Sequence, residues 1–238
     1  MMELDRNGLT STLRTETRAA HAAAEKIFVR ASKADPGCGP VLLMTLNHVL
    51  GGWLADAATR LSPEARTGGF ADELAAFLAI ARGAQPRDAD APGAPEGPRL
   101  VGDAAIAGAS YAVCGSALGA AALASAWHAE RAPAWLAFCA ASRTLEGRWP
   151  RFGAALDAWG ARADAHRDAL AGVRCAFAYA GDVVAALADR GDRARTRDGA
   201  WTRDGAWTDD GARVGAGLAR PGVAPRASIR ASIRAGDG

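Results

Sequence analysis

The sequence has few of the residues that build β-strands. Only 2 of its 238 residues are Tyr and 6 are Phe, and Val and Ile are sparse. Hydrophobic residues nevertheless make up 50% of the chain, and much of that share is Ala, the best helix former. This composition excludes wholesale disorder and favours an all-α protein with a substantial buried core.

We expect no segment that directs the protein to a membrane or out of the cell. No apolar run reaches the roughly 20 residues of a membrane span, and residues 1–16 are polar with mixed charge, unlike a signal peptide. The 4 cysteines form no Cys-x-x-Cys pair. We therefore expect a cytoplasmic protein with free thiols, without a disulfide framework and without a membrane partner.

Neither sign of charge dominates the sequence. The net charge is +2, from 28 Lys and Arg against 26 Asp and Glu. The basic surplus lies in residues 191–238, which hold nine Arg against six Asp. The rest of the chain has no basic stripe of the kind that tracks phosphates, so we expect no nucleic-acid partner.

Apolar residues recur at helical spacing along most of the first 190 residues. The pattern predicts helices over 10–33, 41–61, 70–82, 100–129, 133–147, 149–160 and 162–189. Pro86, Pro92, Pro95 and Pro98 make 83–99 a loop. We expect residues 1–190 to form a single helical domain.

The character of the chain changes after residue 190. The hexapeptide 196–201 is repeated without change at 202–207, within a segment rich in Gly. Two or three short copies are too few to stack as a solenoid. We predict that 191–238 is a disordered, low-complexity tail, with a docking tail that uses Trp201 and Trp207 as the alternative.

His21 and Glu25 stand four residues apart in the first predicted helix, so they lie on one face. An imidazole that binds a metal needs an acceptor for its other N–H, and Glu25 is placed to supply one. An exposed ion pair would produce the same spacing. Taken alone, the pair therefore leaves both interpretations open.

Gly115 and Gly119 fall on one face of the predicted helix 100–129. Each glycine costs roughly 1 kcal/mol relative to Ala within a helix, so a packing or functional reason is expected. Without a Cβ, a flat ligand can approach the backbone closely. A neighbouring helix could do the same, and the motif alone does not separate the two interpretations.

Together, the two motifs resemble those of the heme oxygenases. The segment from Leu13 to Glu25 has their Leu-Arg-x-x-Thr-x-x-x-His-x-x-x-Glu pattern, and Tyr111-Ala-Val-Cys-Gly-Ser-Ala-Leu-Gly119 resembles their glycine-bearing distal helix in its bacterial form. Trp149 to Leu156 and the long helix bearing Phe177 resemble the family's C-terminal half. The resemblance covers residues 10–188 and does not reach the tail.

The resemblance implies an all-α, single-domain multi-helix bundle of the heme oxygenase type and roles for residues in both motifs. His21 would bind the heme iron, Glu25 would orient it, and Gly115 and Gly119 would line the distal side. Ser116 would join a distal water network, with a hydroxyl bonded back to its own helix as the alternative. The other implied heme-binding residues are Arg14 and Arg174, as cations for the propionates, and Tyr111.

The activity implied is oxidative opening of heme to biliverdin, CO and iron, with heme as both substrate and cofactor. No Gly-x-Gly-x-x-Gly motif follows a strand, so electrons would come from an external donor such as ferredoxin or a flavin reductase. A phytochrome-like protein is a possible acceptor of the biliverdin.

The distal motif departs from the family pattern. Cys114 stands where bacterial relatives often have an acidic residue, and Ala124 to Ala126 stand where some carry a basic one. A protein of the same fold that holds heme or another tetrapyrrole without turnover is therefore the alternative. A helical interaction protein that has lost its cofactor site is the third interpretation.

Overall fold

The computed structural model describes residues 8–34, 39–67, 69–83, 94–126, 133–163 and 165–196. Helices dominate these ranges and no strand occurs in them. The prediction of an all-α protein is therefore confirmed. The helices are α1 (Leu9–Glu16), α2 (Arg18–Ala34), α3 (Gly39–Ala58), α4 (Pro63–Arg66), α5 (Phe70–Gly83), α6 (Asp103–Ala126), α7 (Pro133–Ala163) and α8 (His166–Thr196).

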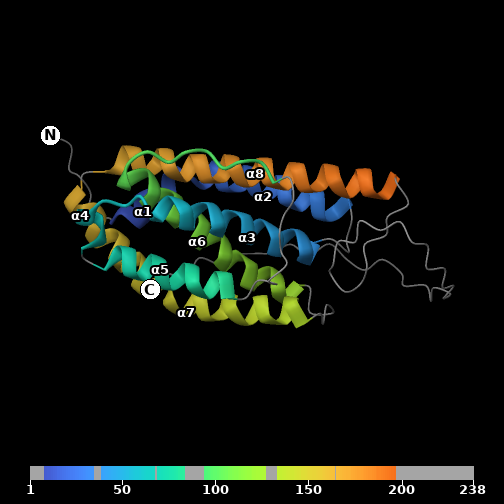
Figure 1. The fold of residues 1–238 in the computed structure, drawn as a ribbon, viewed down its shortest axis with the longest axis horizontal. Helices are drawn as coiled ribbons and strands as arrows, with labels where there is room; N and C mark the ends of the chain where they lie inside the picture. Colours follow the sequence, from blue (N-terminus) through green and yellow to red (C-terminus); the bar gives the residue numbers. More distant parts are fainter. Residues whose placement is uncertain are drawn as a thin grey trace.

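The long helices run side by side as an elongated bundle (Figure 1). α8 and α2 pack together along one edge, α5 and α7 pack along the other, and α6 packs against α3, α7 and α8 between them. All residues from 105 to 110 of α6 are buried, and the hydroxyl of Ser110 is satisfied by the carbonyl oxygen of Ile106 at 2.7 Å. α6 is therefore the central helix of the core.

Large aromatic and aliphatic side chains fill the space between α1, α5 and α7. Phe70 of α5 contacts both Phe152 and Trp159 of α7, with ring centroids 6.1 and 5.8 Å apart. Leu9 and Leu13 of α1 are buried as well. Burial of side chains of this size supplies most of the stabilisation of a helical bundle.

The first predicted helix is interrupted at Thr17, which separates α1 from α2. Both the amide and the hydroxyl of Thr17 donate to the carbonyl oxygen of Leu13, at 3.1 and 2.5 Å. The amide bond is the ordinary helical one, whereas the hydroxyl bond to the same oxygen is of the kind that bends helices at Thr. The amide of His21 then donates to Thr17 at 2.9 Å, so the chain resumes helical geometry at once.

The predicted break between 147 and 149 is wrong, because α7 continues through Pro150. Proline removes one helical hydrogen bond and leaves the carbonyl of Glu146 without its partner. Both residues are exposed, so water can satisfy that carbonyl, and the packing of Trp149 and Phe152 holds the helix together.

The boundary predicted at residue 190 also falls inside a helix, since α8 runs to Thr196. The repeats of the predicted tail, from residue 197 on, lie outside the described residues. The predicted loop 83–99 is partly described. Its residues 94–99 are extended and not helical, as predicted, while 84–93 lie outside the described ranges.

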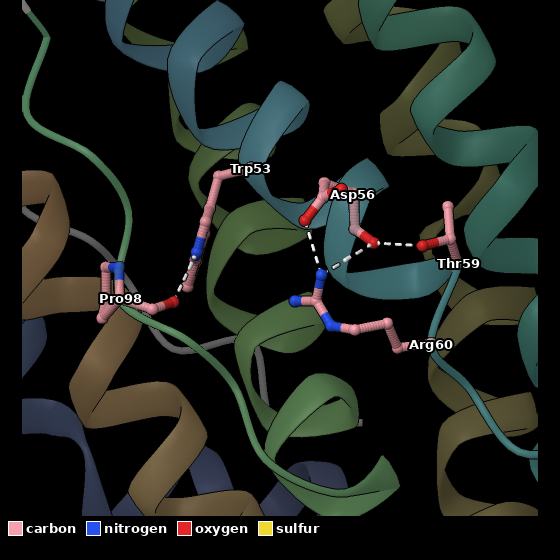
Figure 2. A network of polar contacts seen from close by, with 5 residues as sticks. All are labelled: Trp53, Asp56, Thr59, Arg60 and Pro98. Atoms are coloured by element: carbon pink, nitrogen blue, oxygen red, sulfur yellow. Dashed lines mark hydrogen bonds and ion pairs between the residues drawn. The ribbon is translucent and has the colours of Figure 1, made fainter.

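Residues 94–101 form an extended strap, which runs lengthwise along α8 to the start of α6 (Figure 1). The indole N–H of Trp53 donates to the carbonyl oxygen of Pro98 at 2.8 Å. Figure 2 shows this bond beside the ion pair between Asp56 of α3 and Arg60, which follows that helix. The hydroxyl of Tyr179 donates to the carbonyl oxygen of Pro95 at 2.9 Å. Two helices therefore anchor the strap.

Two helices are long and apolar enough, by length and composition, to cross a membrane: α3 and residues 166–189 of α8. The core helices of soluble proteins pass the same test. In the most apolar window of each, 44% and 39% of the residues are buried against the rest of the chain. The sequence analysis considered only uninterrupted apolar runs. It therefore did not detect these two helices, in which a few polar residues interrupt the apolar sequence.

Candidate functional site

His21 lies in the first turns of α2, with an exposed side chain. Its ring meets the edge of Phe177 of α8, with centroids 5.4 Å apart and planes at 87°. This T-shaped contact restricts the orientation of the imidazole. His21 is thus an exposed imidazole with Phe177 against one side of its ring.

Glu25 is exposed one turn after His21. No hydrogen bond joins the two side chains in the part of the chain that the structure describes. Glu25 instead borders a surface hollow formed by α2 alone. Its role as the acceptor for the imidazole therefore stays a prediction.

The glycines of α6 differ sharply in their surroundings. A Cβ on Gly108 would collide with the backbone of Ala169 in α8, so helix packing requires that glycine. A Cβ on Gly119 would meet nothing within 4 Å, and one on Gly115 would meet only the ring of Trp149, at 3.8 Å. Close helix packing therefore explains Gly108 and leaves Gly115 and Gly119 unexplained within the described chain.

Tyr111 lies one turn before Gly115 on the same face of α6 and is half-buried. Its ring is 5.7 Å from that of Trp149 in α7. Burial raises the pKa of Tyr111, while the charge of Arg14 lowers it and that of Asp157 raises it. The place where α1, α6 and α7 meet therefore holds a group of four residues: Arg14, Tyr111, Gly115 and Trp149.

Trp149 is the member of this group that the sequence analysis did not predict. Trp149 lies one turn before Phe152 on α7, and the centroids of their rings are 5.5 Å apart. The sequence did contain a signal for this contact, because two aromatic residues three positions apart lie on the same face of a helix.

The other predicted site residues are less closely tied to this group. The hydroxyl of Ser116 donates to the carbonyl oxygen of Val113 at 2.8 Å, which is the bond back to its own helix. Arg174 is exposed on α8, one turn before Phe177. Cys114 is buried completely, and burial raises the pKa of its thiol well above its ordinary value. A neutral thiol packs as a small apolar group.

Within the described residues, no three His, Cys, Asp or Glu side chains form a group that could hold a metal ion. A heme needs no such group, because the porphyrin supplies the equatorial nitrogens and the protein adds an axial ligand. α2 and α6 both pack against α8. His21 is exposed on α2, and a Cβ on Gly119 of α6 would meet nothing within 4 Å.

Two surface hollows of the described chain are lined by residues other than His21, Gly115 and Gly119. One is the hollow of α2, and the other lies beside α4 and the start of α6. Compared with family models, curated proteins and solved structures, the chain matches none of them.

Proposed function

We propose that the chain binds heme and opens it oxidatively to biliverdin, CO and iron, as a heme oxygenase. The observation that carries the proposal is the open space at Gly115 and Gly119. A glycine in a helix interior is unfavourable, and here no contact within the described chain compensates for it. A flat ligand that lies against the backbone would do so.

Each residue of the site would have a simple task. His21 would hold the iron through one ring nitrogen, while Phe177 keeps the imidazole plane from turning. Arg14 and Arg174 would pair with the propionate carboxylates through charge-assisted hydrogen bonds. When bound, heme supplies both the substrate and the metal that activates O2.

On the distal side, the chain's contribution would be shape and exclusion of water. The missing Cβ atoms of Gly115 and Gly119 let the α6 backbone approach the ligand. The aromatic rings of Tyr111 and Trp149 border that face and limit where a flat molecule can slide. Such a boundary would direct oxidation to one edge of the ring.

A second candidate function is heme binding without turnover. The observation that favours it is the hydrogen bond of Ser116, whose only proton points to its own helix. Its oxygen could still accept a hydrogen bond from water, but it would not donate one to a distal ligand. This arrangement supports a holding protein as well as an enzyme.

A hemin titration tests both functions. We expect a Soret band in the wild type and its loss in His21→Ala, while His166→Ala, at the start of α8, keeps it. Addition of ascorbate, or of ferredoxin and its reductase, under O2 should then convert the band to biliverdin absorbance. A stable Soret band would support the holding protein, and no band in the wild type would exclude both functions.

A further inference from the structure

Trp53 of α3 and Tyr179 of α8 form an aromatic pair beneath the strap. Their ring centroids are 5.1 Å apart, and their planes meet at 57°. Each ring directs its one polar proton to the strap. The indole N–H donates to the carbonyl oxygen of Pro98 at 2.8 Å (Figure 2), and the tyrosine hydroxyl donates to that of Pro95 at 2.9 Å. The two carbonyls that accept these bonds therefore belong to prolines three residues apart.

The spacing of the two prolines matches the backbone that prolines favour. The segment from Pro95 to Pro98 reads Pro-Glu-Gly-Pro, a Pro-x-x-Pro motif in an extended stretch. Proline fixes its own φ at about −65° and favours extended backbone in the residue before it. These preferences lead to the polyproline II helix, which has about three residues per turn. Residues three apart lie on the same side of such a helix, so both carbonyls can reach one pair of rings.

The residues between the two prolines differ in how they meet the rings. Gly97 lies so close to Trp53 that a Cβ on this glycine would collide with the indole. Glu96 is exposed, and it takes part in none of the ion pairs of the described residues. The rings therefore contact two proline carbonyls and a glycine, and they leave the residue after the first proline free to vary.

The motif itself is held at few points. Within the described residues, the two hydrogen bonds from the aromatic pair are those that join the strap to the helices. The large apolar anchor of the strap is Leu100, which is buried and lies beyond the motif. The segment 95–98 can therefore leave the rings while Leu100 stays in the core.

We propose that Trp53 and Tyr179 form a recognition site for extended segments of the type Pro-x-Gly-Pro, which the strap fills in cis and which a partner protein with such a segment fills in its place. The chemistry of the ligand is that of the occupant already seated on the rings. Domains that bind Pro-x-x-Pro ligands likewise use aromatic grooves, and the stiffness of the proline-rich segment lowers the entropy lost on binding.

This site is separate from the proposed heme site. Phe177, which contacts His21, and Tyr179 are two residues apart on α8, so their side chains point to different sides of that helix. The proposal therefore does not depend on heme. The strap is an intramolecular competitor at a millimolar effective concentration, so a partner gains access when the strap is released.

The first arm of the test asks whether the prolines hold the strap. In Pro95→Ala/Pro98→Ala, we expect solvent exchange of the Trp53 indole N–H to quicken at least about tenfold, because its acceptor leaves. NMR measures this signal, which is assigned by its absence from Trp53→Phe. The matched control is Pro133→Ala/Pro150→Ala, which replaces two exposed prolines of α7 and should leave the exchange unchanged. An unchanged rate in the strap variant would overturn the proposal, because the rings would then not recognise the prolines.

The second arm supplies the ligand in trans to the heme-free full chain. The probe is a fluorescein-labelled peptide with the sequence of residues 94–101, and fluorescence anisotropy measures its binding. We expect its Kd for Pro95→Ala/Pro98→Ala to be at least about tenfold lower than for the wild type, in which the strap competes. The same peptide with alanine in place of both prolines is the control and should not bind.

Further variants protect this arm against a misfolded site. Gly97→Val should also release the strap, since its side chain would collide with Trp53, and it should bind the peptide as tightly as the double-alanine variant. Adding Trp53→Phe and Tyr179→Phe to either variant keeps two aromatic rings but removes both donors, so the Kd should rise at least about tenfold. Circular dichroism checks that each variant remains helical.

Three results would overturn the proposal. They are no binding of the peptide to either strap-released variant, equal binding of the proline-free peptide, and equal binding after both donors are removed. A wild-type dimer that the peptide dissociates would assign the rings to the strap of a second copy, and it would overturn the assignment to a partner protein.

Discussion

Gly108 of α6 and Gly172 of α8 lie at one helix crossing, each against the backbone of the other helix. A Cβ on Gly108 would collide with the carbonyl of Ala169, and a Cβ on Gly172 would collide with the carbonyl of Ala105. The two contacts are reciprocal, so no side chain separates α6 and α8 at this point, where the two helices run in the same direction (Figure 1). The central helix of the bundle is held by backbone proximity at this point.

Gly108→Ala should destabilise the protein by at least about 2 kcal/mol, because the new methyl group meets backbone that cannot change rotamer. For a chain of this length, that corresponds to a fall in Tm of about 4–8 °C. Thermal and urea unfolding measure the change. Gly119→Ala is the matched control on the same helix, and it should be neutral or gain up to about 1 kcal/mol. Equal effects of the two substitutions would show that the crossing is looser than described.

Gly119→Leu should leave the heme-free protein folded but weaken its affinity for hemin at least about tenfold, because the side chain would occupy the space above the α6 backbone. Soret titration measures the affinity, and urea unfolding checks the stability. The control is Gly52→Leu on α3, where a Cβ also meets nothing within 4 Å. If hemin binds the two variants equally well, the glycine face of α6 is not the heme contact.

The helices of this protein could be predicted because their apolar periodicity is strong and local. Most of the predicted segments overlap a helix of the structure. The errors at Thr17 and Pro150 arose because single residues have weak effects whose outcome depends on context. Thr17 bonds locally to Leu13 and interrupts the helix, while an exposed proline on a well-packed helix does not.

The site was less accessible from the sequence, because its features depend on contacts between distant segments. The sequence offered no distinction between Gly108 and Gly119, yet one meets the α8 backbone and the other meets nothing. The edge contact between His21 and Phe177 joins residues 156 positions apart. Both facts follow from how α2 and α6 pack on α8, which no local pattern records.

The strap should depend on its two side-chain hydrogen bonds. Tyr179→Phe removes the hydroxyl that donates to Pro95, and Trp53→Phe removes the N–H that donates to Pro98. Each should cost about 1 kcal/mol of stability. Hydrogen exchange should quicken at the amides of residues 96, 97 and 99–101 and stay unchanged in α7. If the exchange of these amides is unaffected in both variants, other contacts hold the strap in place.

Glu73 of α5 should make the protein more stable at neutral than at acidic pH. Arg148 and Arg151 of α7 donate to its two carboxylate oxygens, at 2.8 and 2.6 Å. Burial of the carboxyl opposes its ionisation, but these hydrogen bonds and charges outweigh burial and hold the pKa of Glu73 below its ordinary value of 4.5. The folded protein therefore binds fewer protons at this site than the unfolded chain.

From this sign, the stabilisation is fully present above pH 4.5 and is lost as the pH falls through the lowered pKa of the folded state. Glu73→Gln should lower the free energy of unfolding by about 1–2 kcal/mol at neutral pH, since Arg151 is largely exposed and solvent screens its charge. The difference from the wild type should shrink between about pH 5 and pH 3 in urea unfolding. Glu146→Gln on the exposed face of α7 is the control, and its curve should run parallel to that of the wild type. A gap between wild type and Glu73→Gln that stays constant with pH would mean that the two arginines do not favour the ionised carboxylate.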